Sequence, residues 1–245
     1  MATAPAATKT AKGEQTRQLI LETALELFRE RGYEDTTMRA IAERAGVALG
    51  GAYYYFRSKE ELIQGFYLRT HEEHLAASAA ILAGGGTFRE RLLGVMRTKL
   101  ETIAPYHQFS GKLFKTAADP DSPLNPCSAE SQPARREATS VFAEVMRGAT
   151  DLKLPEDLAA ELPDLLWTYH MGVILFWVHD RSPGQARTWR LMERTVDLVA
   201  RLVALARNPL LAPVRKSALR LFRELRHDGV PEPDPPTADE EEATP

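Results

Sequence analysis

The fold is decided by residues 37–59, which read TMRAIAERAGVALGGAYYYFRSK. Two short helical segments fit this stretch, separated by Gly46, because glycine tolerates the left-handed backbone of a tight turn. A small residue, Ala42, stands where the two helices would meet. The apolar residues placed to seat the second helix are Val47, Ala52 and Tyr55. This spacing predicts a helix-turn-helix whose second helix covers residues 48–56.

The segments on either side of this motif are also helical in pattern. Residues 15–31 carry an apolar face formed by Ile20, Ala24, Leu27 and Phe28, and end at Gly32, a residue favoured just past a helix end. On the other side, Ser58 and Glu61 have the spacing of a capping box and open a long helix that reaches about residue 83.

The rest of the chain repeats the helical period, and no run of alternating β-branched residues predicts a strand. The further expected helices are residues 88–105, a short one marked by Phe109, Leu113 and Ala117, then 128–147, 155–179, 185–207 and 209–226. The sequence therefore predicts an all-α fold: an N-terminal three-helix domain followed by a larger C-terminal helical domain.

Composition and charge exclude several classes of protein. The longest uncharged apolar run, residues 165–178, has 14 residues, fewer than the roughly 20 that a membrane helix needs. No signal segment is evident, so we expect a cytoplasmic protein without membrane contact. The single cysteine excludes an internal disulfide or a thiolate zinc site. Residues 228–245 hold seven acidic residues, and removing them changes the net charge from −3 to +4, which suits a polyanionic partner.

The N-terminal pattern resembles the tetracycline-repressor (TetR) family of transcriptional regulators over about residues 16–62. The matching residues are Ala24, Phe28, Gly32, Tyr33, 36–42, 45–47, Gly50, 53–56 and 58–62. The remaining chain resembles the family only in its helix layout. The resemblance implies a dimer that binds a double-stranded DNA operator through the helix-turn-helix and releases it when a small molecule binds the C-terminal domain.

The resemblance also implies roles for individual residues. Thr37 would contact a phosphate, and Arg39, just behind it, would reach a phosphate or a guanine edge. Tyr53 and Lys59 would bind phosphates, Lys59 from the first turn of its helix, where the dipole also favours an anion. Base reading would fall to the exposed face of the second helix, formed by Ala48, Leu49, Gly50, Gly51 and Tyr54.

Three positions depart from the family pattern. Ala48 replaces a capping serine, Leu49 replaces a polar or basic residue, and Gly51 replaces a threonine or serine that contacts DNA. Each change removes a hydrogen bond, and the Gly50–Gly51 pair costs the helix roughly 1 kcal/mol per residue relative to alanine. We expect Leu49 to pack on a thymine methyl group, and discrimination to depend on Arg39 and on DNA shape.

Two of the expected helices, residues 155–179 (the eighth in the chain) and 185–207 (the ninth), predict a homodimer interface. Residues 165–178 are apolar nearly all round a helix, so one chain would cover only one face of it. The ninth helix carries a seam at spacings of three and four residues, which suits packing on another helix. The seam consists of Leu191, Thr195, Leu198, Leu202 and Leu205. In the family, such helices form a four-helix dimer interface.

The family's effector pocket lies among the fifth to eighth helices, which here are the expected helices between residues 88 and 179. The residues that would line it here are Met96, Phe109, Leu113, Phe142, Trp167 and His170. The same apolar and aromatic pattern is also typical of an ordinary core. Because these segments offer few buried charges, the expected effector is an uncharged, largely apolar molecule.

Enzyme and metal sites find little support. His71 and His74 are three residues apart, without the spacing of a zinc protease, and are expected on a solvated helix face. Cys127 has no evident His or Asn partner and is expected to be an inert thiol. We expect neither catalysis nor a cofactor.

The predicted organisation has four parts: a flexible arm (1–13), a DNA-binding domain (14–60), a ligand-binding and dimerisation domain (61–227) and an acidic disordered tail (228–245). The leading hypothesis is a ligand-responsive dimeric regulator, most simply a repressor of a pseudo-palindromic operator. The alternative is a helical ligand- or protein-binding module that has lost DNA specificity.

Overall fold

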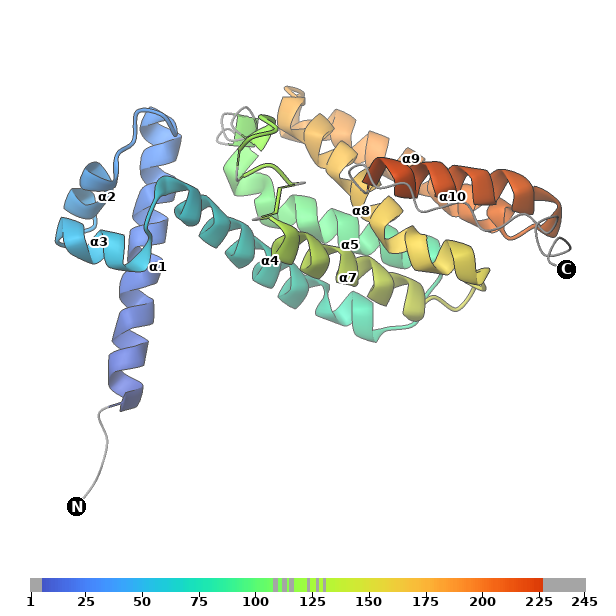
Figure 1. Ribbon diagram of the computed structural model, residues 1–245, viewed down its shortest axis with the longest axis horizontal. Helices are drawn as coiled ribbons and strands as arrows, with labels where there is room; N and C mark the ends of the chain where they lie inside the picture. The colour runs from blue at the N-terminus through green and yellow to red at the C-terminus, as the bar shows by residue number, and fades with distance from the viewer. Residues whose placement is uncertain are drawn as a thin grey trace, which may run out of the picture.

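The computed structural model describes residues 6–226 apart from 108–109, 112–113, 115–116, 123, 127 and 130, with side chains described from residue 11 onward. Within these residues the chain is helical, with one isolated bridge between Gly86 and Ala149. The three N-terminal helices lie at one end, and a single long helix, α4, joins them to the C-terminal bundle (Figure 1). The predicted all-α class is confirmed.

The N-terminal helices are α1 (Ala6–Arg31), α2 (Met38–Arg44) and α3 (Leu49–Tyr55), followed by α4 (Lys59–Ala83). Both glycine turns have the predicted left-handed backbone, with φ of 93° at Gly32 and 66° at Gly46. The start of α1 differs from the sequence prediction, because the helix already includes residues 6–13 of the expected flexible arm. Three alanines in this segment favour helix.

The predicted apolar faces meet in one core beneath the helix-turn-helix. Ile20, Ala24 and Phe28 of α1 are completely buried. The other elements contribute Ile41, Ala42, Ala52, Phe56, Leu62 and Ile63 to the same cluster. Leu62 and Ile63 belong to α4, so the first turn of that helix is part of the N-terminal core.

The capping of α4 differs in detail from the predicted box. The Glu61 amide donates to Ser58 Oγ over 3.3 Å, as expected, but the Glu61 carboxylate accepts from the backbone amide of Arg57 rather than from that of Ser58. A complete capping box occurs instead between Thr87 and Glu90.

The C-terminal bundle contains the remaining helices: α5 (Phe88–Ile103), α7 (Gln132–Arg147), α8 (Glu156–His179), α9 (Ala186–Ala206) and α10 (Ala212–Arg226), with short 3-10 turns at Ala104–Tyr106, Pro183–Gln185 and Pro209–Leu211. Helix α7 begins four residues later than predicted, after Ser131. Phe109, Leu113, Cys127 and the acidic tail lie outside the described residues.

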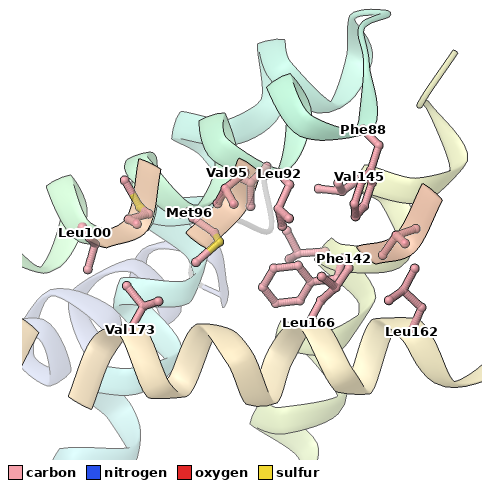
Figure 2. Close-up of a cluster of buried hydrophobic side chains, with 14 of the residues drawn as sticks. Phe88, Leu92, Val95, Met96, Leu100, Phe142, Val145, Leu162, Leu166 and Val173 are labelled. Atoms are coloured by element: carbon pink, nitrogen blue, oxygen red, sulfur yellow. The ribbon is translucent and has the colours of Figure 1, made fainter. Parts of the chain in front are cut away.

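The bundle has its own core, formed where α5, α7 and α8 face one another (Figure 2). Leu92, Val95 and Met96 of α5 are completely buried. They pack among side chains of α7 and α8 that include Phe142, Val145, Leu162, Leu166 and Val173. Met192 and Val196 extend this cluster into α9.

Arg91 holds together the ends of two helices of this bundle. Its side chain is 2% exposed, and its guanidinium donates to five backbone carbonyl oxygens. These belong to Ile81 (2.8 Å), Leu82 (3.1 Å) and Gly84 at the end of α4, and to Glu144 (2.9 Å) and Val145 (2.9 Å) of α7. Carbonyls in the last turn of a helix lack intrahelical donors, so a buried cation satisfies them.

Gly148, which follows α7, makes room for this guanidinium. Its φ of −86° suits any residue, so glycine is required here for space rather than for backbone freedom. A Cβ atom at this position would lie 2.2 Å from Nη2 of Arg91.

We predict that Gly148→Ala lowers the free energy of unfolding by about 2 kcal/mol or more, because the guanidinium would have to leave its carbonyl partners. Urea unfolding measures this change. Gly85→Ala is the matched control, since its Cβ would meet only Thr150 Cγ2 at 3.9 Å. Equal losses in the two variants would contradict the assignment.

Candidate nucleic-acid interface and effector cavity

The outer face of α3 presents a nearly bare backbone flanked by tyrosines. Ala48 and Gly50 are exposed, and Tyr54 is 82% exposed. A Cβ at Gly50 or Gly51 would meet nothing within 4 Å, so packing inside the chain does not require glycine there. The two glycines leave room for another molecule to approach the helix backbone closely.

Two features of α3 bear on the sequence predictions. Ala48 stands at the N-cap and makes no side-chain capping bond, as its residue type predicted. Leu49, in contrast, is half-buried and packs against the N-terminal core. This packing stabilises the start of a short helix that has no side-chain cap. The expected contact of Leu49 with a thymine methyl group therefore competes with its packing inside the chain.

Helix α2 presents Thr37 and Arg39 beside this face. Thr37 is the N-cap of α2, and its Oγ1 accepts from the Ala40 amide over 3.2 Å. Arg39 is exposed and has no ion pair or hydrogen bond among the residues that the structure describes. Arg44, on the same helix, is already held by Glu30, with N–O distances of 2.9 and 3.2 Å. Arg39 is thus the cation of α2 that is available to a phosphate or a base.

Lys59 is engaged within the chain. Its ammonium donates to the carbonyl oxygens of Tyr33 (2.7 Å) and Glu34 (3.4 Å) and lies 4.4 Å from the centroid of the Tyr33 ring. Sequence reasoning assigned Lys59 to a phosphate and did not foresee this anchor. An ammonium has three N–H donors, so one remains for a phosphate.

A cavity of about 230 Å³ lies between α4, α5, α7 and α8. Its walls are mostly apolar and include Phe66, Ile103, Phe142, Trp167, Met171 and Trp177. Of the residues predicted for an effector pocket, Phe142, Trp167 and His170 line this cavity. Met96 does not line it but is completely buried in the bundle core, and Phe109 and Leu113 lie outside the described residues.

Basic side chains gather on one part of this wall, which we call the basic cluster: Lys99, His71, His74 and His170. The expectation that His71 and His74 occupy a solvated helix face is wrong, because they are only 9% and 5% exposed. The signal for their burial was their spacing from Phe66 and Thr70, which places all four on one face of α4. Lys99 likewise lies at helical spacing from Met96 and Ile103, on the same face of α5.

Burial sets the protonation of the cluster. It lowers the pKa of His74 to about 4 and that of His170 to about 3, with the nearby Lys99 charge as the second cause. Burial also lowers the pKa of Lys99 to about 8. At neutral pH the histidines are therefore neutral and the lysine carries the charge. His74 Nε2 donates to the Val95 carbonyl over 2.9 Å, which fixes its ring.

The described part of the chain contains no group of three or more His, Cys, Asp or Glu residues arranged to bind a metal ion. The same residues include no helix long and apolar enough to cross a membrane.

Helix α9 exposes the seam predicted for dimerisation. Leu198, Leu202 and Leu205 are each slightly more than half exposed, whereas Thr195 is half-buried and bonded to the Tyr169 hydroxyl over 2.6 Å. Leu175 of α8 is also exposed. Sequence reasoning missed further exposed apolar residues after α9, namely Leu210, Val214, Leu221 and Leu225.

Comparison with known families decides where this arrangement belongs. Residues 20–65 match the family model of bacterial regulatory proteins of the tetR family, and residues 91–220 match that of the tetracyclin repressor-like C-terminal domain. The chain belongs to the TetR family.

Individual relatives resemble this TetR-family chain over limited lengths. It is 46% identical over 54 residues to the regulator SrpR of Pseudomonas putida, covering 22% of this chain and 25% of SrpR. It is 32% identical over 105 residues to the repressor KstR2 of Rhodococcus jostii, covering 43% of this chain and 52% of KstR2. The chain thus spans from a quarter to about half of these relatives.

Among solved structures, the regulator FadR of Bacillus subtilis in complex with stearoyl-CoA has a TM-score of 0.58 and 16% identity. The match covers 73% of this chain and 96% of FadR. At that identity the likeness establishes the shared fold.

The neutral, buried histidines predict acid sensitivity. In the unfolded chain a histidine has a pKa near 6.5, so unfolding takes up protons once the pH falls below that value, and stability falls with it. Between pH 6.5 and 5, His170 alone should account for a loss of about 2 kcal/mol.

We therefore predict that His170→Leu removes about that much of the decrease in unfolding free energy between pH 7 and pH 5, measured by urea unfolding. The control is His179→Leu, because the His179 ring is exposed in the folded chain. If His170→Leu leaves the pH dependence of wild type intact, His170 is not a buried neutral group.

Proposed function

We propose that the chain is a ligand-responsive, dimeric transcriptional regulator that represses from a pseudo-palindromic DNA operator and leaves it when a small molecule fills the cavity. One observation carries this proposal: a single helix belongs to both sites. The first turns of α4 place Leu62, Ile63 and Phe66 in the N-terminal core, and its next turns place His71 and His74 on the cavity wall.

The exposed face of the helix-turn-helix supports DNA as the partner. Arg39 and Tyr54 are exposed beside a glycine-rich backbone, and Lys59 keeps a donor for phosphate. Arg39 supplies the cation, Tyr53 and Tyr54 supply hydroxyl donors, and Thr37 fixes the start of α2. With few base-reading side chains, the operator is selected largely by its shape and by Arg39.

The exposed leucines support dimerisation through α8 and α9. Three leucines at helical spacing on α9, each about half exposed, form an apolar stripe that water contacts in the single chain. In a two-fold symmetric dimer, the leucine stripe of each copy would be covered by the equivalent stripe of the other copy. The dimer would then present two reading helices to the two halves of a pseudo-palindrome.

The named relatives agree with this function. KstR2 is a repressor, and FadR was solved with an acyl-CoA. An apolar cavity on α4, α5, α7 and α8 is the corresponding place for an effector in this chain.

The DNA contact is tested with duplex DNA from upstream of the chain's own gene, by fluorescence anisotropy at several salt concentrations. Arg39→Ala should weaken binding by roughly 10-fold, the effect of losing a cation on a phosphate or guanine. Arg44→Ala should stay within about twofold, because Glu30 already pairs with that arginine. If Arg39 contacts a phosphate, the slope of the logarithm of the binding constant against the logarithm of the salt concentration also decreases in magnitude by about 0.9 in this variant.

Equal effects of the two substitutions would contradict the assigned face of α2. A wild-type protein that sediments as a monomer at micromolar concentration and retains no upstream fragment would contradict the proposed function as a whole, and would leave the binding-module alternative.

A further inference from the structure

The cavity wall carries a partly buried cation, Lys99, whose closest opposing influence among the described residues is the charge of Glu73. The Lys99 ammonium donates to the Thr70 carbonyl over 3.4 Å, and no salt bridge forms with it among the described residues. The described cavity wall contains no Asp or Glu. A cation that is partly removed from water and forms no salt bridge is stabilised by an added negative charge, so the site favours a ligand that brings one.

A second residue of the same cavity wall, His170, has an unmet hydrogen-bonding need. His170 is 6% exposed, and its Nδ1 atom is buried without a hydrogen-bond partner among the described residues. The ring is fixed by an edge contact with Phe142, 5.6 Å between centroids. Lys99 and His170 line the same cavity, and burial together with the nearby Lys99 charge lowers the pKa of His170.

The cavity also has a second cation. Arg135 lines it from α7, with its guanidinium 5.9 Å from the centroid of the Trp167 ring. The rest of the wall is apolar and aromatic, so the basic groups would bind one end of a ligand while the apolar wall covers its body. From the sequence, few buried charges and an uncharged effector were expected here, whereas Lys99 and Arg135, both partly buried, support a ligand that carries a negative charge.

We propose that the effector is an organic anion, a monocarboxylate with an apolar body, whose carboxylate accepts hydrogen bonds from Lys99 and from His170. This inference rests on the proposed function, because it names the ligand class of the same cavity. The carboxylate neutralises the Lys99 charge and satisfies Nδ1 of His170, while the apolar body displaces water from the aromatic wall. An uncharged molecule of the same shape would leave both groups unsatisfied, so the site discriminates between them.

The test compares dodecanoate with dodecanol, which share a chain and differ in charge. Binding is followed by calorimetry and by the fluorescence of Trp167 and Trp177, which line the cavity. Wild-type protein should bind dodecanoate at least 10-fold more tightly than dodecanol. Lys99→Met should abolish that preference, and Lys153→Met, at an exposed lysine outside the cavity, should preserve it.

A second variant protects the test against a folding defect. His170→Leu should weaken dodecanoate binding by about 10-fold and leave dodecanol binding close to wild type, and cooperative urea unfolding verifies that each variant is folded. Equal affinity for the two probes, no binding of dodecanoate, or a preference that survives Lys99→Met would each overturn the proposal. Binding of lauroyl-CoA without dodecanoate would also overturn it, because recognition would then lie in the coenzyme head group.

Operator binding is measured on the same wild-type preparation. If the protein binds its operator but not dodecanoate, only the ligand class fails. If it binds dodecanoate but no operator DNA, the proposed function fails and the ligand class stands.

Discussion

Helix α4 is shared by two hydrophobic cores, and the two sites depend on this sharing. Leu62 and Ile63 are completely buried in the N-terminal core, so the start of α4 moves with α1 and the helix-turn-helix. Two turns later the same helix buries His71 and His74 against the cavity. A helix is stiff over this length, so the two surfaces cannot move independently.

Both ends of α4 are also fixed by cations on backbone carbonyls. Lys59, its first residue, binds the carbonyls of Tyr33 and Glu34, and Arg91 binds the carbonyls of the last turn together with those of α7. Under the proposed function, a ligand in the cavity contacts a helix that is held at both ends. Such a ligand shifts the DNA-binding equilibrium only if it binds one position of α4 more tightly than another.

The sequence predicted those parts of the molecule that depend on local patterns. The apolar spacing of Ile20, Ala24 and Phe28 identified the buried face of α1, and Gly32 and Gly46 identified the turns. Relations between distant segments were not predictable in this way. Nothing near Arg91 in the sequence shows that its guanidinium reaches the end of α7, and nothing near Lys59 shows that the Tyr33 carbonyl lies within reach.

The basic cluster was missed for a different reason. His71 and His74 flank two glutamates, which favoured a solvated face, although their spacing from Phe66 and Thr70 places them on the buried face of α4. Lys99 is spaced with Met96 and Ile103 on α5, but lysines are usually exposed, so this spacing alone did not predict its place on the cavity wall. Leu49 was assigned to a thymine methyl group from its place on the reading helix, and its neighbours in the sequence do not reveal that it also packs against the N-terminal core.

The coupling through α4 is tested most directly by filling the cavity without any ligand. Ala138 lines the cavity from α7, and Ala138→Phe places a ring in the space that an effector would occupy. Operator affinity is measured by anisotropy against Ala77→Phe, at an exposed position of α4 outside the cavity. If α4 couples the two sites, Ala138→Phe raises the dissociation constant for operator DNA at least 10-fold, while Ala77→Phe leaves it close to wild type. A folded Ala138→Phe dimer that binds the operator as tightly as wild type would contradict this coupling.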